Sequence, residues 1–186
     1  RASRAESLER VALAIPACDE QAMLGLGILE RDIFCYDGDE SDLIGRYLAA
    51  AKKYKADLIV RLCGDNPCIE PWVIDYTVAE YLFFCKPFVS TMGDYQHSQW
   101  PDGIGCEVFS VDRLKWLDQK TRGQDGLREH PHRWFHENHA VYEPIYRGPV
   151  FPRGLKLDVN TQAEYEYVKD IFDAFPPLKL FGLGDI

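Results

Sequence analysis

The sequence predicts an α/β protein with a mainly parallel sheet, on the basis of three observations. Short β-branched and aliphatic runs alternate with segments of helical periodicity along the first half of the chain, which is typical of βαβ units. The strand-like runs are apolar almost without interruption, which indicates a sheet covered on both faces. The run "ADLIVRLC" then ends abruptly in Gly64-Asp65-Asn66-Pro67, polar and turn-forming residues of the kind found beyond the carboxyl ends of such strands.

The strands and helices can be placed in chain order from these patterns. We expect strands over residues 10–16, 32–38, 56–63, 87–91, 106–110, 140–146 and 155–159. Helices are expected over residues 39–55, 70–85, 111–121 and 162–175, with a weaker helical pattern at 19–31 and a further helix within 128–139.

Each of the longer helices has its own local signals. The helix over 39–55 begins with acids, ends with lysines and carries an apolar face, made of Leu43, Ile44, Tyr47, Leu48 and Ala51. The helix over 70–85 opens with Pro71 at a first helical position, and its apolar face is expected to contain Ile74, Thr77, Val78, Tyr81 and Leu82. Thr161 and Glu164 form a T-x-x-E capping box for the helix over 162–175.

Composition limits the classes of function. The 186 residues suffice for one domain with a substantial core, and 46% apolar and 27% charged residues are ordinary for a globular protein. A formal net charge of −9 argues against a broad nucleic-acid interface. No apolar run approaches the roughly 20 residues that span a bilayer, so no membrane partner is expected. The opening "RASRAESLERV" lacks the apolar region of a signal peptide.

The six cysteines favour free thiols in a reducing cytoplasm. None of them forms a C-x-x-C pair, and several lie in apolar strand-like runs. Zinc binding by Cys63 and Cys68 is disfavoured, because their spacing is wrong for a zinc knuckle and no second pair follows.

Two acids at the ends of two predicted strands are candidate metal ligands. Asp65 follows one strand and Asp158 lies in "LKLDVNT", where Asp158 and Asn160 share a face opposite Leu157 and Val159. Two carboxylates facing one crevice suit Mg²⁺, which prefers oxygen ligands together with substrate phosphates. The alternative, in which Asp65 and Asn66 form a plain turn and Asn160-Thr161 only cap a helix, stays open.

Four stretches together resemble a known family of enzymes. They are "GDESDLIGRYLAAAKKYKADLIVRLCGDNPCIEP", "FVSTMGDYQHSQWPDGIGCEVFS", "REH" and "LKLDVNTQAEYEYVKDIF". In these the chain resembles the cytidylyltransferases that activate acidic sugars, and it is most similar to the branch of spore-coat polysaccharide biosynthesis. CMP-sialic acid and CMP-3-deoxy-manno-octulosonate synthetases are related families. The resemblance implies a three-layer Rossmann-like nucleotidyltransferase fold, similar to GT-A, in a single domain over residues 1–186.

The resemblance also implies an activity and a partner set. A sugar hydroxyl would attack the α-phosphorus of a nucleoside triphosphate, with CTP favoured, using Mg²⁺ and releasing pyrophosphate. The implied product is a nucleotide sugar for surface polysaccharide, made in the cytoplasm. Residues 92–150 would form a subregion for the sugar pocket and for a homodimer interface.

Roles for individual residues follow from the same resemblance. Asp65 and Asp158 would be catalytic metal ligands, with Asn160 as a third. Asp42, Arg46, Gly64 and Asn66 would lie at the nucleotide. The sugar pocket would be flanked by Tyr95, Asp102, Glu107, Arg128 and Glu129.

Two departures from the family pattern leave activity open. The family begins with a strand, a phosphate-binding loop and a helix, and we expect this segment to be missing before Arg1. The acid of the family's "VDTPED" pattern aligns with Asn160, so Asp158, two residues earlier on the same face, would have to replace it. A non-catalytic relative acting as a binding or dimerisation module is the main alternative. A GT-A glycosyltransferase is a second, disfavoured because "GDNP" and "DVN" are poor matches to D-x-D.

Two other features have alternative interpretations. His132, His136 and His139 recur at helical spacing, but without an H-E-x-x-H pattern a zinc site is disfavoured against a surface or sugar-facing helix. Trp100 is expected either to stack on a sugar or to pack at a dimer interface.

Overall fold

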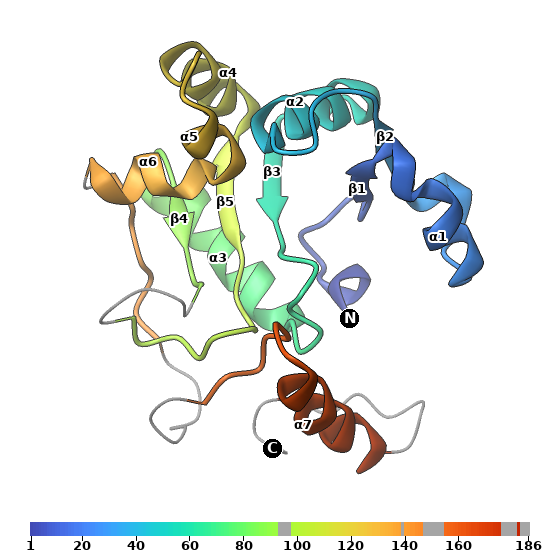
Figure 1. Ribbon diagram of the computed structural model, residues 1–186. Helices are drawn as coiled ribbons and strands as arrows, with labels where there is room; N and C mark the ends of the chain where they lie inside the picture. The colour runs from blue at the N-terminus through green and yellow to red at the C-terminus, as the bar shows by residue number, and fades with distance from the viewer. Residues whose placement is uncertain (93–97, 139, 147–154, 176–181, 183–186) are drawn as a thin grey trace. The chain divides into compact units, whose positions relative to one another are not determined.

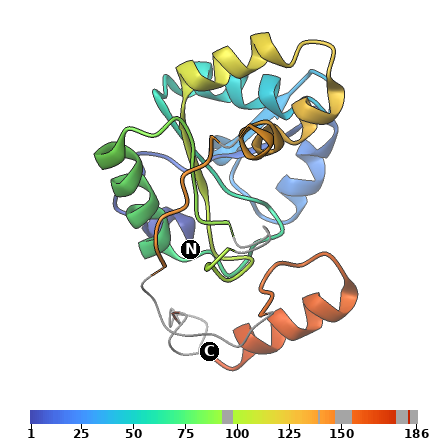
Figure 2. The same ribbon diagram turned by 90° about the vertical axis from the view of Figure 1, so that its left-hand side faces the viewer.

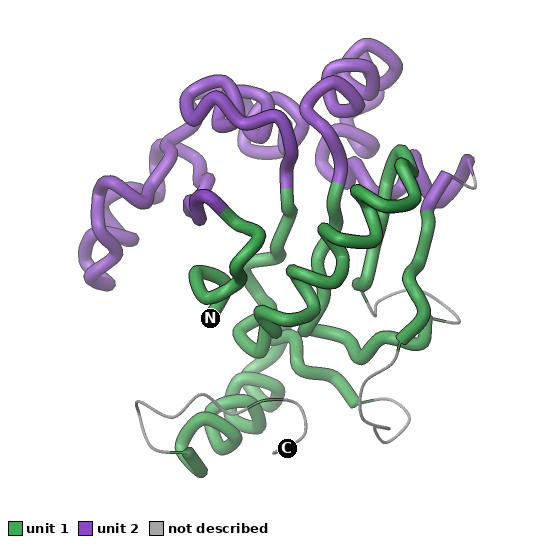
Figure 3. The backbone as a smooth tube through the Cα atoms, turned by 180° about the vertical axis from the view of Figure 1, so that it is seen from behind, with its two compact units in different colours: residues 1–8, 60–108, 142–186 green, residues 9–59, 109–141 purple. Residues whose placement is uncertain are grey.

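The computed structural model describes residues 1–92, 98–138, 140–146, 155–175 and 182. Figure 3 shows the two compact units into which the chain divides. Unit 1 comprises residues 1–8, 60–108 and 142–186, and unit 2 comprises residues 9–59 and 109–141. The predicted subregion 92–150 is therefore shared between them, and its sugar-pocket and dimerisation roles stay predictions.

Unit 2 contains the parallel strand pair that the alternating pattern predicts. β1 (Leu13–Pro16) pairs in parallel with β2 (Ile33–Tyr36), with Leu13 opposite Ile33. The connection contains the short helix α1 (Glu20–Gly25), and Gly27 after it has a left-handed φ of 81°. The predicted weak helix over 19–31 is thus only six residues long, because the glycines that weaken its pattern follow at its end.

A second sheet has three strands in the order β3-β5-β4 (Figure 1). They are β3 (Leu58–Arg61), β4 (Val89–Ser90) and β5 (Glu107–Ser110). β4 and β5 pair antiparallel, with Val89 opposite Val108. An antiparallel strand within an otherwise parallel arrangement agrees with the prediction of a mainly parallel sheet.

The longer helices lie where their sequences predict them, except that the helix expected over 39–55 begins only at Leu43, so its acids precede the first turn. They are α2 (Leu43–Tyr54), α3 (Pro71–Phe84), α4 (Val111–Lys120) and α7 (Gln162–Asp173), while α5 (Asp125–Glu129) and α6 (Pro131–Glu137) are short. Asp42 caps α2 by accepting a hydrogen bond from the backbone N–H of Gly45. The predicted capping box of Thr161 and Glu164 is present at the start of α7, which confirms that prediction. Figure 2 shows α7 as the orange-red helix.

Two predicted strands are wrong, and so is one residue of the predicted apolar face of α3. Among the described residues, 155–159 make one isolated bridge, between Lys156 and Asp102, and 140–146 make one, between Tyr142 and Val89. Their backbone groups are satisfied by single contacts with other segments rather than by a continuous ladder. On α3, Leu82 is 64% exposed, because the buried face of that helix runs through Val73, Ile74, Thr77 and Val78 instead.

The core of unit 1 joins segments that are distant in sequence. It contains Cys68, Val73, Trp100, Ile104, Leu157 and Val168. Trp100 is only 3% exposed and its indole N–H donates to the carbonyl of Pro144 at 2.8 Å. Both interpretations of Trp100 from the sequence are therefore corrected: it is a core residue of its own chain. Within the described ranges, no helix is both long and apolar enough to cross a bilayer.

Arg61 and Glu107 form a buried ion pair between β3 and β5, with Nη1 and Oε2 2.7 Å apart. Their side chains are 9% and 1% exposed. We expect Glu107→Ala to lower the free energy of unfolding by about 3 kcal/mol, because removing one partner of a buried pair leaves a charge in the interior. Urea unfolding measures this loss.

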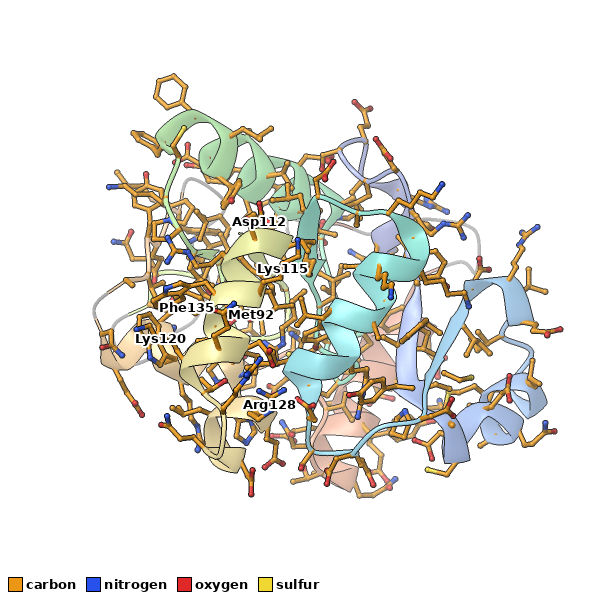
Figure 4. The ribbon with its side chains drawn as sticks, turned by 90° about the horizontal axis from the view of Figure 1, so that it is seen from above. Met92, Asp112, Lys115, Lys120, Arg128 and Phe135 are labelled. Carbon is orange, nitrogen blue, oxygen red and sulfur yellow. The ribbon has the colours of Figure 1, made fainter. Side chains whose placement is uncertain are left out.

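Lys115→Ala is the matched control, because Lys115 and Asp112 form a pair of similar length on the exposed face of α4 (Figure 4). Solvent screens that pair, so its loss should leave the unfolding midpoint almost unchanged. Equal effects of the two substitutions would contradict the assignment of Arg61 and Glu107 as a structural pair.

Candidate functional site

The residues predicted to form the site fall into two groups, one in each unit. Unit 1 holds Gly64, Asp65, Asn66, Asp102, Glu107, Asp158 and Asn160. Unit 2 holds Asp42, Arg46, Arg128 and Glu129. Tyr95 lies outside the described residues.

In unit 1, two backbone hydrogen bonds connect residues 156–160 to the two loops that carry the other acids. The N–H of Val159 donates to the carbonyl of Asp65 at 2.8 Å. The N–H of Leu157 donates to the carbonyl of Asp102 at 3.1 Å. Asp158 lies between these two anchor points, so the backbone brings the loops of Asp65 and Asp102 to its sides.

The carboxylate of Asp158 is buried and has one unused oxygen. Asp158 is 7% exposed, and its Oδ2 accepts a hydrogen bond from the amide Nδ2 of Asn160 and pairs with Nζ of Lys156 at 3.4 Å. Asp158 and Asn160 therefore share a face, as their spacing predicts. Oδ1 of Asp158 is buried and has no hydrogen-bond partner in the part of the chain that the structure describes.

The charges around this carboxylate act on Asp102. Burial, followed by the negative charge of Asp158, raises the pKa of the Asp102 carboxyl. Lys156 and the N–H of Gly103 oppose the shift, and Asp65 adds to it. The charges of Asp158 and Asp65 thus act on the Asp102 carboxyl group, and a positive charge nearby would offset them.

The local backbone explains how Asp102 is held against Asp158. Gly103 has a left-handed φ of 88°, and a Cβ there would lie closer than 3.0 Å to the backbone of both Leu157 and Asp158. Only glycine permits this approach. The Pro-Asp-Gly pattern in "WPDG" is typical of a turn at Gly103, but it carries no signal for this close packing.

The Gly64-Asp65-Asn66-Pro67 loop combines an exposed acid with a buried amide. Asp65 is exposed, whereas Asn66 is 7% exposed and its Nδ2 is buried without a hydrogen-bond partner among the described residues. Asn66 and Cys63 line a cavity of about 200 Å³. The loop therefore carries an unused buried donor beside the exposed carboxylate.

The cysteines beside the loop are free thiols, as the sequence predicts. Burial raises the pKa of Cys68 to about 11 and that of Cys106 to about 12. Both thiols therefore stay protonated near neutral pH and are poor metal ligands and nucleophiles. Glu107 is occupied by its ion pair with Arg61, and its predicted contact with a sugar stays a prediction.

In unit 2, Arg128 (labelled in Figure 4) pairs with two carboxylates. Its Nη2 is 2.8 Å from Oδ1 of Asp42 and its Nη1 is 2.9 Å from Oδ1 of Asp118. Burial alone would lower the pKa of Arg128, but hydrogen bonds to the two acids raise it above its usual value. The predicted site residues Asp42 and Arg128 are thus direct partners, and Asp118 is a third member that the sequence did not identify.

Tyr36 completes this network from the end of β2. Its hydroxyl donates to Oδ2 of Asp42 at 3.3 Å, and burial followed by the charge of Asp42 raises the pKa of Tyr36. A Cβ at Gly45 would lie closer than 3.0 Å to both side chains, so this glycine makes room for the contact. The start of α2 is therefore fixed by Tyr36, Asp42 and Arg128 acting together.

The other two predicted residues of unit 2 have weaker contacts. Arg46 donates from Nη2 to the carbonyl of Glu40 at 2.5 Å, and its Nε is buried without a partner in the described ranges. Glu129 is exposed and lies 4.0 Å from His130. Nothing in these contacts tests their predicted roles toward a nucleotide or a sugar.

No group of three histidine, cysteine or acidic residues suited to a metal ion occurs within the described residues. His130, His132 and His136 are among the described residues and belong to no such group, whereas His139 lies outside the described residues. A pair of carboxylates is enough for Mg²⁺, because this ion usually takes one or two carboxylates, keeps several waters and binds substrate phosphates. Asp65 and Asp158 fit that requirement, since Oδ1 of Asp158 is buried and unused.

Lys156 and Glu164 are the members of this site that the sequence did not identify as such. Lys156 pairs with both Asp158 and Glu164. The available signal was the alternation of Lys156, Asp158 and Asn160 with Leu155, Leu157 and Val159, which places the lysine on the polar face. Glu164 was recognised only as a capping residue.

Comparisons with known proteins agree with these observations. The model of a family described as cytidylyltransferase matches residues 17–179. An uncharacterized protein of Methanocaldococcus jannaschii is 30% identical over 136 residues, which cover 70% of this chain and 52% of that protein. The spore coat polysaccharide biosynthesis protein SpsF of Bacillus subtilis is 22% identical over 174 residues, covering 88% of this chain and 68% of that protein. The chain thus spans about half the length of the archaeal relative.

Solved structures give the same result at the level of fold. A cytidylyltransferase from Leptospira borgpetersenii has a TM-score of 0.71 and 28% identity, covering 85% of this chain and 65% of that one. A CMP:2-keto-3-deoxy-manno-octonic acid synthetase complexed with CTP has a TM-score of 0.59 and 15% identity, covering 93% and 84%. These likenesses confirm the predicted α/β nucleotidyltransferase-like fold.

Substitution can separate two properties of Gly103, its close packing against the backbone of Leu157 and Asp158 and its left-handed φ. Gly103→Ala should both destabilise the protein and weaken divalent-cation binding, because the new Cβ forces residues 157–158 away from the Asp102 loop. Gly123→Ala is the control, since Gly123 has a φ of 75° but open space around its Cβ position. It should cost only the left-handed strain, about 1 kcal/mol. Thermal unfolding and Mn²⁺ titration measure the two effects, and equal losses in both variants would contradict the packing role.

The raised pKa of Asp102 predicts a pH-dependent effect on stability. Its carboxylate form destabilises the fold, and this loss accumulates as pH rises from the unfolded value of 3.8 through the folded pKa. Asp102→Asn should therefore raise the melting temperature at pH 7 without divalent cations, and the gain should vanish below about pH 4.

Asp39→Asn is the control of opposite sign, because hydrogen bonds from Ser41 lower the pKa of Asp39. It should lower the melting temperature at pH 7. A gain from Asp102→Asn that is equally large at pH 3 and pH 7 would show that charge is not its cause.

Proposed function

Because the chain belongs to the cytidylyltransferase family, we propose that it transfers a cytidylyl group from CTP to a hydroxyl of an acidic sugar. The product would be a CMP-sugar for surface polysaccharide synthesis, with pyrophosphate as the second product. Two relatives support the choice of substrates. One is a CMP:2-keto-3-deoxy-manno-octonic acid synthetase complexed with CTP, and the other is a spore coat polysaccharide biosynthesis protein.

The observation that carries this proposal is the buried, unused Oδ1 of Asp158 in a segment anchored to the loop of Asp65. A carboxylate oxygen without a partner is costly in a folded protein unless a ligand satisfies it. Asp65 and Asp158 would hold Mg²⁺ there, with Asn160 beside them. The bound ion would supply the positive charge that offsets the charge of the triphosphate during transfer.

The reaction that we propose is a direct displacement. The sugar hydroxyl oxygen bonds to the α-phosphorus, the bond from that phosphorus to the bridging oxygen of the β-phosphate breaks, and pyrophosphate leaves with those electrons. The hydroxyl proton passes to solvent. The chain itself would contribute positioning, which can supply several kcal/mol of the barrier reduction: Asp42 and Arg46 at the nucleotide, and Arg128 through its hold on Asp42.

The remaining parts of the proposal rest on the cysteines and on the family pattern. A cytoplasmic location agrees with six free cysteines, which are typical of a reducing compartment. A homodimer is proposed by analogy with the family. Tyr95, Asp102, Glu107 and Glu129 are proposed to contact the sugar, as the family pattern implies.

Calorimetric titration with CTP, with and without Mg²⁺, tests the nucleotide site. We expect binding that depends on Mg²⁺ and that Asp65→Asn or Asp158→Asn weakens about tenfold or more, since losing even a supporting residue of a metal site often costs that much. Asp112→Asn, on the exposed face of α4, controls for the loss of one negative charge.

Pyrophosphate release tests the reaction on the full-length protein. CTP should give more product than ATP, GTP or UTP when a panel of acidic sugars is supplied with Mg²⁺. Binding of CTP without release of pyrophosphate from any sugar would support a binding module instead, and the absence of both would contradict the proposal.

A further inference from the structure

Lys156 has two acidic partners of different kinds. Its Nζ lies 3.4 Å from Oδ2 of Asp158 and 3.2 Å from Oε1 of Glu164. Asp158 is nearly buried, whereas Lys156 and Glu164 are about half and one quarter exposed in their side chains. The lysine thus bridges a buried carboxylate and a carboxylate at the surface.

Glu164 is held in place independently of Lys156. Its other oxygen, Oε2, accepts hydrogen bonds from the backbone N–H groups of Asn160 and Thr161 at 2.9 and 2.8 Å, and from the Thr161 hydroxyl at 3.0 Å. The Asn160 N–H, followed by Lys156, lowers the pKa of Glu164 to about 2. Glu164 is therefore a fixed anion with Oε1 available to the lysine over the whole physiological pH range.

Lys156 is also the cation that offsets the charges of the neighbouring acids. Asp158 and Asp65 raise the pKa of Asp102, and Lys156 is the positive group that opposes them. Lys156 donates a hydrogen bond to Oε1 of Glu164, and this bond, followed by the charge of Asp158, raises the pKa of Lys156 itself. The ammonium lies against Oδ2 of Asp158, beside the unused Oδ1 that a divalent cation would take, so its charge would repel that cation.

We propose that Lys156 is an exchangeable counter-ion of Asp158, which withdraws to Glu164 when a divalent cation binds. The proposal rests on the function proposed above, in which Asp158 binds Mg²⁺. An ammonium and a divalent cation on one carboxylate repel each other, whereas the flexible four-carbon stem of lysine allows its head to shift. Glu164 already holds that head at 3.2 Å, so the ammonium keeps a partner when it leaves Asp158.

The exchange predicts opposite effects of two substitutions. Lys156→Met removes the competing ammonium, so it should tighten divalent-cation binding about threefold to tenfold. Glu164→Gln leaves Lys156 with Asp158 as its main partner, so it should weaken cation binding by about the same factor. Glutamine is accepted in capping boxes, so the start of α7 should stay intact.

A double variant separates exchange from a general effect of charge. If Glu164 acts through Lys156, then Glu164→Gln should have little effect in the Lys156→Met background, which a double-mutant cycle measures. A general loss of negative charge would weaken binding equally in both backgrounds. Lys169→Met is the matched control, because Lys169 carries the same charge as Lys156 but pairs with Asp173, and both of these residues lie on α7. It should leave cation affinity unchanged.

The experiment is Mn²⁺ and Mg²⁺ titration of the full-length protein and these variants, by electron paramagnetic resonance and calorimetry, without nucleotide. Tighter binding by Lys156→Met, weaker binding by Glu164→Gln and coupling between them would support the exchange. The inference alone would be overturned if the wild type binds the cation, Asp158→Asn abolishes that binding, and Lys156→Met leaves it unchanged or weaker. The proposed metal site would then stand without the exchange. Absence of cation binding in the wild type would overturn the proposed metal site and this inference with it.

Discussion

The candidate metal site of unit 1 depends on how residues 156–160 are anchored. Two backbone hydrogen bonds, from Leu157 to Asp102 and from Val159 to Asp65, join three segments that are far apart in sequence. Leu157 packs in the core of unit 1 at the same time. The carboxylates of the site therefore come together through backbone contacts and apolar burial, while their own charges oppose the arrangement. The fold supplies the free energy that holds the acids close, and a bound cation or a lysine has to offset the remaining repulsion between their charges.

That balance explains the distribution of polar partners in unit 1. Asp158 has one oxygen committed to Asn160 and Lys156 and one left unused. Glu164 is held by the capping box of α7, so Thr161 and Glu164, which start the helix, also fix the acid that pairs with Lys156. A local structural motif thus acquires a second role because of its position next to a buried acid. In unit 2, Arg128 pairs with Asp42 and Asp118, and Asp118 also lies 3.9 Å from Arg122.

The sequence predicted the helices well and the site only in part. α2, α3 and α7 were identifiable because periodicity and capping are local signals, carried by residues such as Pro71 and Thr161. The burial of Trp100 and the exposure of Leu82 were not, since each depends on which segments pack against the residue. Residues 155–159 alternate like a strand, yet they form a single bridge, because their hydrogen-bond acceptors lie in two separate loops. The pairing of Lys156 with Asp158 could not be predicted from the sequence, because it depends on this irregular backbone.

Asn160 occupies the position where the family pattern has an acid, and its contacts show how an amide is compatible with the site. An acid there would place a second negative charge against Asp158, which is already buried and near Asp102. The amide instead donates a hydrogen bond to Oδ2 of Asp158, so this oxygen of the buried acid has a polar partner. Because the donor occupies Oδ2, the unused oxygen is Oδ1. Asn160 therefore determines which oxygen of Asp158 is available, and the two residues act as one unit: the acid provides the charge and the amide orients it.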